Sequence, residues 1–232
     1  MTRSVDLGNP FLKDLSGVCE LLLVRHGEQA YTPNMILADG VDAPLSELGE
    51  QQAAAVGERL SSTPLAHVYA SPLQRARDTG RAIASHHNME VAERDELQEI
   101  NFFAQLPQDQ GLLDSVGADE LRDIYRAANR TNRWDAYPHS EDVPAFRRRI
   151  VETMDALLAA HVGDRIVVAC HGGVINTWLA HLFGASHDRV CTIHHTSITT
   201  VRGAADRRAV VQVNDYAHVL PIQTELNPDN AS

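Results

Sequence analysis

Leu21-Leu22-Leu23-Val24-Arg25-His26-Gly27-Glu28 is the most informative stretch in this chain of 232 residues. Four apolar residues in a row predict a buried strand, and the abrupt change to charged residues marks its end. In open α/β sheets, ligands bind at such strand ends. The stretch therefore places the imidazole of His26 beside the guanidinium of Arg25 at a position suited to holding a phosphate.

A second strand ends in the same way much later in the chain. In the strand expected at 165–170, five apolar residues follow Arg165, and His171, Gly172 and Gly173 come directly after them. Because the carboxyl ends of parallel strands lie at one edge of a sheet, we expect His26 and His171 to meet despite their separation in sequence. A glycine directly after each histidine lets a ligand approach the backbone closely.

Two predicted helix starts supply further donors for a phosphate. Arg75 follows Ser71 and Pro72, and proline suits the first turn of a helix. Arg25 and Arg75 would then provide two guanidiniums, the side-chain group best matched to phosphate. Helix N-termini at Pro72 and Gly172 add oriented backbone amides, so Gly172 is predicted to bind the phosphate as well.

The chemistry of such a site requires a nucleophile and a proton donor. A neutral imidazole can attack phosphorus, and a second histidine can stabilise the charge that develops on the phosphoryl oxygens. The leaving alkoxide needs a proton from a carboxyl group whose pKa is raised. Glu99, within Leu97-Gln98-Glu99-Ile100-Asn101-Phe102, is the candidate for this role, and Glu96 is the nearest substitute.

The alternation of strands and helices predicts an α/β fold: a single domain with a mainly parallel β-sheet covered by helices on both faces. This domain spans residues 19–220, between a loosely attached N-terminal arm at 1–18 and a C-terminal tail at 221–232. The segments 29–44 and 95–117 have no clear period, and we expect them to cover the site. The other expected elements are strands at 66–70, 89–92, 198–201 and 210–213, and helices after the N-cap Ser46, from Pro72, and at 118–130, 142–161 and 174–183.

Composition limits the partners and the compartment. The formal net charge is −11, which argues against a broad basic surface for nucleic acid or an anionic membrane. The three cysteines, Cys19, Cys170 and Cys191, have no metal-ligand spacing and fit reduced thiols in the cytoplasm. We find no signal peptide and no apolar run long enough to span a membrane, so a soluble cytoplasmic protein is expected. The oligomeric state stays open, a homo-oligomer included.

Several ordered segments together resemble a known family. They are RHGE at 25–28, LSELGEQQA at 45–53, YASPLQRARDT at 69–79, CHGG at 170–173 and VNDYAH at 213–218. In this order the chain resembles the histidine phosphatase superfamily, the phosphoglycerate mutase-like proteins, over roughly residues 20–218. The resemblance implies that His26 becomes a phosphohistidine and that Arg25, Arg75 and His171 hold the phosphoryl group. It also implies that Glu99 donates the proton, and it implies no metal and no organic cofactor.

Three functions remain open on this reading. The first is a metal-independent phosphomonoesterase, a histidine acid phosphatase-type hydrolase that acts through phosphohistidine on a phosphorylated small molecule. The second is a phosphoglycerate-type mutase, and the third is a phospholigand-binding module without catalysis. The substrate is not predicted, because the segments 29–44 and 95–117 that would shape the pocket have no interpretable pattern.

His194 and His195 do not form a metal-ligand motif. Adjacent residues on a strand point to opposite faces, and no HExxH spacing accompanies the pair. The sequence therefore predicts no metal site, and it assigns His195 no role.

Overall fold

The computed structural model describes residues 12–32, 35–204 and 207–222. Residues 1–11 of the predicted arm and 223–232 of the predicted tail lie outside this part. Leu12 and Val18, in the described part of the arm, are buried. Within the described ranges, no helix is both long enough and apolar enough to cross a membrane.

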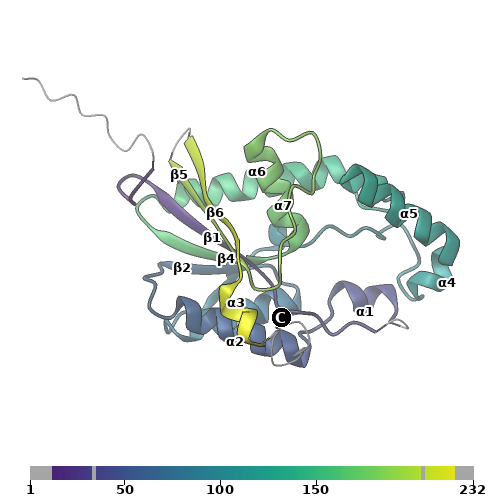
Figure 1. Cartoon of the computed structure of the whole chain (residues 1–232), viewed down its shortest axis with the longest axis horizontal. Coiled ribbons are helices and arrows are strands. Elements are labelled where there is room, and N and C mark those ends of the chain that lie inside the picture. Colours follow the sequence, from purple (N-terminus) through teal and green to yellow (C-terminus); the bar gives the residue numbers. More distant parts are fainter. Residues whose placement is uncertain (1–11, 33–34, 205–206, 223–232) are drawn as a thin grey trace, which may run out of the picture.

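A six-stranded sheet forms the centre of the molecule, in the order β3-β2-β4-β1-β5-β6 (Figure 1). The pairs β1/β4, β2/β4 and β2/β3 are parallel, which confirms the mainly parallel α/β fold. β5 runs antiparallel to β1, and β6 is antiparallel to β5. The strands are β1 (Cys19–Arg25), β2 (His67–Ala70), β3 (Val91–Glu93), β4 (Arg165–Cys170), β5 (Ile198–Ala204) and β6 (Arg207–Asp215).

Helices cover both faces of this sheet. α2 and α3 pack together and α3 contacts β2 and β4, whereas α6 and α7 pack together and both contact β1. A smaller lobe formed by α1, α4 and α5 extends beyond the strand ends (Figure 1). The helices are α1 (Leu37–Val41), α2 (Glu47–Leu60), α3 (Gln74–Ser85), α4 (Leu112–Val116), α5 (Ala118–Thr131), α6 (Val143–Ala160) and α7 (Gly172–Phe183), with 3₁₀ turns η1 (Asp95–Leu97), η2 (Trp134–Ala136) and η3 (Ala217–Val219).

The apolar run of β1 serves both layers because successive side chains point to opposite faces of a sheet. Leu21 and Leu23 belong to the core cluster that contains Trp178 of α7. Leu22 and Val24 belong to the cluster on the other face, with residues of α2 and α3. Burying such a side chain contributes roughly 1.5–3 kcal/mol. β1 is therefore held from both sides, and the position of its last residue is fixed.

Of the two helix N-termini next to the strand ends, that of α2 is as predicted and that of α3 begins later than predicted. Ser46 caps α2 as expected, because the Gly49 amide donates to its hydroxyl over 3.0 Å. α3 begins at Gln74, two residues beyond the predicted start at Pro72. Its Gln74 amide donates instead to the Asp42 carboxylate over 2.7 Å, a cap from a distant segment that local sequence does not reveal.

Candidate active site

The two strand-end histidines meet, as the sequence predicts. β1 and β4 are parallel neighbours with Arg25 opposite Cys170, so His26 and His171 leave adjacent strands at the same level. The His26 amide donates to the Cys170 carbonyl over 2.9 Å. The two imidazole rings lie with their centroids 5.1 Å apart.

His26 is held as a neutral imidazole with a free Nε2. Its Nδ1 lies 2.6 Å from the Gly27 carbonyl oxygen, which can only accept, so the ring proton sits on Nδ1. The Arg75 Nε donates toward Nε2 over 3.4 Å. Burial, followed by the charges of His171, Arg75 and Arg25, lowers the pKa of His26 well below its usual value. An unprotonated nitrogen is therefore available near neutral pH.

Each of the two arginines is anchored to the backbone by one amino group. Arg25 Nη1 donates to the Ile193 carbonyl over 2.5 Å, and Arg75 Nη1 donates to the Val41 carbonyl over 2.7 Å. The buried Arg25 Nε has no hydrogen-bond partner in the described part of the chain. Burial lowers the pKa of both guanidiniums, and the charge of Glu99 opposes this shift. Two cations in fixed positions beside His26 have the charge and donor geometry that a dianion requires.

Glu99 lies in this cluster, and Glu96 does not. The carboxylate of Glu99 accepts the Ile100 amide over 3.0 Å and the Gly173 amide over 2.9 Å. Burial raises the pKa of Glu99, opposed by these two hydrogen bonds and by Arg75 and Arg25. The side chain of Glu96 is exposed and does not line the cleft. Of the two carboxyl groups that the sequence offered, the structure brings only Glu99 to the histidines.

Gly173 leaves room for the carboxylate of Glu99. A Cβ atom there would collide with the Glu99 carboxylate. At Gly172 a Cβ atom would meet only the Arg25 side chain, at an ordinary 3.6 Å. Gly172 is the first residue of α7, and its contact with phosphate stays a prediction.

His171 is completely buried at the N-cap of α7. Among the described residues neither of its ring nitrogens has a hydrogen-bond partner. Burial and the charges of Arg75 and Arg25 lower its pKa well below the usual value, so the ring is neutral near pH 7. A neutral imidazole can donate one hydrogen bond to a phosphoryl oxygen.

Sequence reasoning missed two side chains at this site. His195 lies between α7 and β5 with its ring centroid 5.6 Å from that of His26. Burial, with Arg25 and His194, lowers its pKa to about 4. Buried Thr79 accepts the Gly27 amide over 3.1 Å and donates to the Arg75 carbonyl over 2.7 Å. Thr79 lies one helical turn after Arg75, and this spacing could have placed it at the site from the sequence. His195 lies in a loop, where no periodicity indicates which way a side chain points.

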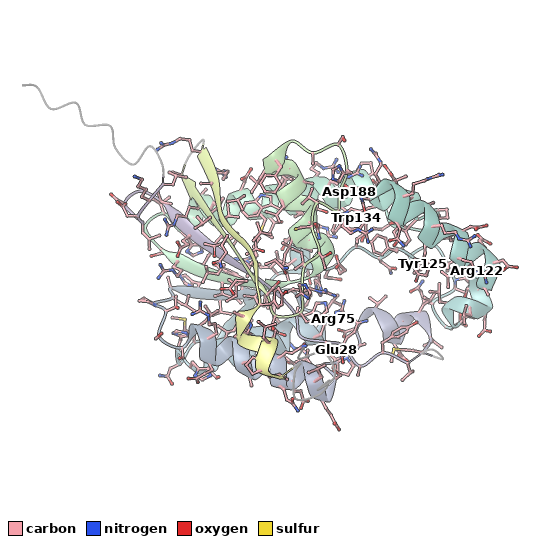
Figure 2. All side chains as sticks on the ribbon, in the orientation of Figure 1. Glu28, Arg75, Arg122, Tyr125, Trp134 and Asp188 are labelled. Carbon is pink, nitrogen blue, oxygen red and sulfur yellow. The ribbon has the colours of Figure 1, made fainter. Side chains whose placement is uncertain are left out.

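Part of this cluster opens onto a cleft of about 320 Å³, and the side chains at the strand ends are called its floor below. Arg25, His26, Arg75 and Glu99 line its inner end. Apolar and aromatic residues of the lobe line the outer end, and Figure 2 shows Arg75 near the strand ends and Tyr125 on the inner side of α5. No group of three or more His, Cys, Asp or Glu side chains suited to a metal ion occurs within residues 12–32, 35–204 and 207–222.

The fold is that of the phosphoglycerate mutase-like proteins. A mycobacterial glucosyl-3-phosphoglycerate phosphatase superposes with a TM-score of 0.68, at 23% identity, over 85% of this chain and 99% of that one. The family model "Histidine phosphatase superfamily (branch 1)" matches residues 21–216. The chain therefore belongs to the histidine phosphatase superfamily.

Two plant proteins are similar in sequence. "Phosphoglycerate mutase-like protein 4" of Arabidopsis thaliana is 32% identical over 205 residues, which is 86% of each chain. "Metal-independent phosphoserine phosphatase" of the same species is 31% identical over 175 residues, 74% of this chain and 71% of that protein. Members of the superfamily are phosphatases or mutases, and these relatives support an enzyme of phosphoryl chemistry.

Proposed function

We propose that this protein is a metal-independent phosphomonoesterase that acts on a small phosphorylated metabolite through a phosphohistidine at His26. The observation that carries the proposal is the state of that imidazole. Its proton is held on Nδ1 by the Gly27 carbonyl, and its Nε2 lies beside an anchored guanidinium. This combination leaves the nucleophilic nitrogen unprotonated next to a cation that can hold the target phosphate.

In the first half-reaction, the phosphoryl group of the substrate binds between Arg25, Arg75 and His171. His26 Nε2 attacks phosphorus, a nitrogen–phosphorus bond forms, and the bond from phosphorus to the leaving oxygen breaks. The carboxyl group of Glu99 gives its proton to that oxygen, which leaves as an alcohol. The raised pKa of Glu99 supports this role, because it increases the fraction of protonated carboxyl near neutral pH.

In the second half-reaction, the Glu99 carboxylate takes a proton from water as its oxygen attacks phosphorus. The nitrogen–phosphorus bond breaks, inorganic phosphate leaves, and both His26 and Glu99 return to their starting states. The same carboxyl group therefore acts first as acid and then as base. The guanidiniums of Arg25 and Arg75 stabilise the charge on the phosphoryl oxygens in both steps.

Trapping the phosphoenzyme tests this proposal. Rapid mixing with phenyl phosphate in the presence of EDTA, followed by quenching, should yield an acid-labile, alkali-stable phosphoenzyme on the wild-type chain. His26→Ala should yield none and should lose at least about 10³-fold in kcat. His187→Ala, at an exposed histidine away from the cleft, is the matched control and should behave as wild type.

Each other outcome would contradict the hydrolase. Unchanged turnover in His26→Ala would exclude the nucleophile. Transfer of the phosphoryl group between positions of phosphoglycerate without phosphate release would establish a mutase. Binding of phosphate without turnover of any phosphomonoester would establish a binding module.

A further inference from the structure

The cleft has two ends of opposite character. The inner end is the charged cluster at the strand ends. The outer end is an apolar wall, by which we mean Tyr31, Met35, Leu37, Phe103, Leu112 and Tyr125. A phosphomonoester bound with its phosphate at the inner end would place its alcohol portion against this wall.

The apolar wall is a built surface. It comes from Tyr31 and residues 35–37 on one side and from residues 103–125 on the other, and backbone hydrogen bonds join residues 36–38 to residues 108–111. The Leu37 amide donates to the Gln110 carbonyl over 2.9 Å. Phe102, which also lines the cleft, stacks on Tyr137 with ring centroids 4.0 Å apart. These contacts hold the apolar side chains in place before any ligand binds, which limits the entropy lost on binding.

Two aromatic side chains stand at its mouth. Tyr31 is 54% exposed and Tyr125 is 41% exposed. Both rings line the cleft, and the Tyr125 ring also packs edge-on against Tyr137 with centroids 6.3 Å apart. Exposed apolar surface gathered around a cavity is typical of a ligand-binding groove.

No cation lines the outer end in the described part of the chain. The arginines that line the cleft are Arg25 and Arg75, and both belong to the phosphoryl site. Arg122, on the same helix as Tyr125, is paired with Asp119 over 2.8 Å and does not line the cleft. A substrate carboxylate or second phosphate could accept hydrogen bonds from the amides of Gln29 and Asn101, which also line the cleft, but it would gain no ion-pair partner at the outer end, so its loss of water would be unfavourable.

We propose that this cleft selects phosphomonoesters whose alcohol portion is uncharged and apolar, such as an arylalkyl or medium-length alkyl group, over substrates that carry a carboxylate. The inference rests on the proposed phosphomonoesterase activity and names its substrate class. A volume of about 320 Å³ suits a single ring or a short chain beyond the phosphate. This preference would differ from that of the phosphoserine phosphatase relative, because phosphoserine carries a carboxylate.

A series of n-alkyl phosphates from ethyl to hexyl tests this preference. The leaving alcohols have nearly equal acidity, so the chemical step is constant and only the contact with the wall changes. Each buried methylene is expected to raise kcat/KM by up to about fourfold. We expect at least about a tenfold rise from ethyl to hexyl phosphate, and at least about a tenfold advantage of hexyl phosphate over phosphoserine and 3-phosphoglycerate.

Variants of the wall locate the effect. Tyr125→Ala and Leu112→Ala should flatten the dependence on chain length, whereas Tyr125→Phe keeps the ring and should retain it. Leu113→Ala is the matched control, because Leu113 is an exposed neighbour on α4 that does not line the cleft. Leu112→Arg adds a cation to the wall and should shift the preference toward 3-phosphoglycerate.

Binding of alkylphosphonates separates this inference from the proposed activity, since their carbon–phosphorus bond is not hydrolysed. Calorimetry should show tighter binding of hexylphosphonate than of ethylphosphonate. If no ester is turned over but this difference is found, the activity fails and the apolar selectivity stands. If esters are turned over but neither kcat/KM nor phosphonate affinity depends on chain length, or if 3-phosphoglycerate is preferred, the selectivity is wrong and the activity stands.

Discussion

The floor and the wall of the cleft are built on different principles. The floor lies at the ends of β1 and β4, and its histidines are placed by a parallel ladder with a fixed register. The wall comes from two segments outside the sheet that are joined to each other by backbone hydrogen bonds. Rigid placement at the floor suits bond making and breaking, and an added lobe lets the contacts with the alcohol portion vary. Under the two proposals made above, chemistry and selectivity within one cleft therefore belong to separate parts of the chain.

Removing the proposed acid from the floor should give the largest effect. Glu99→Gln should lower kcat for alkyl phosphates by about 10²–10⁴-fold and should have less effect on p-nitrophenyl phosphate, whose leaving group needs no proton. Steady-state kinetics with both substrates measures this difference. An equal loss for both would show that Glu99 binds phosphate and does not transfer a proton.

The pH dependence follows from the same residue. Burial raises the pKa of Glu99, so its acid form is lost as pH rises through that raised value, and kcat/KM should fall on the alkaline side. The pKa of His26 is lowered, so the nucleophile stays neutral into the acid range. The ratio of the wild-type kcat/KM to that of Glu99→Gln should decline as pH rises. The ionisation of the substrate affects both proteins equally and cancels in this ratio. A constant ratio would contradict the assignment.

A smaller change to the floor tests its steric fit. Gly173→Ala should push the Glu99 carboxylate out of place and lower kcat by about 10²-fold, because a misplaced proton donor loses most of its effect. His181→Ala, at an exposed residue of the same helix that does not line the cleft, is the matched control and should cost no more than about threefold. Equal losses in the two variants would mean that helix α7 itself is disturbed, which circular dichroism and thermal unfolding would reveal.

His195 should contribute less than the other histidines. It lies beside His26, and its pKa of about 4 keeps it neutral above pH 5. His195→Asn should lower kcat/KM by about tenfold or less and should leave the shape of the pH profile unchanged above pH 5. A loss as large as that of His26→Ala would move His195 into the catalytic group.

The smallest expected effect is that of a wall substitution on the stability of the protein. Tyr125 is exposed, so Tyr125→Ala should change the free energy of unfolding by no more than about 0.5 kcal/mol. Chemical denaturation monitored by circular dichroism measures this value. A loss above about 2 kcal/mol would place Tyr125 in the core and would remove the distinction between floor and wall.

Much of the floor was predictable because its signals are local. An apolar run that ends in histidine and glycine marks a strand end, and two such runs imply a meeting point once the sheet is parallel. Arg75 was found for a similar reason, although its helix begins two residues later than expected. The choice of Glu99 over Glu96 was not local, because it depends on how the chain turns after η1 toward Gly173.

By itself, the sequence determined the α/β class and the family, and it named four residues that the structure brings together, namely Arg25, His26, Arg75 and His171. Hydrophobic periodicity and short motifs act over a few residues, and these features need nothing more. Only the tertiary structure decided the antiparallel direction of β5 and β6, the position of His195 and the apolar wall. Each of these arises from contacts between residues far apart in the chain, which leave no period or spacing in the sequence.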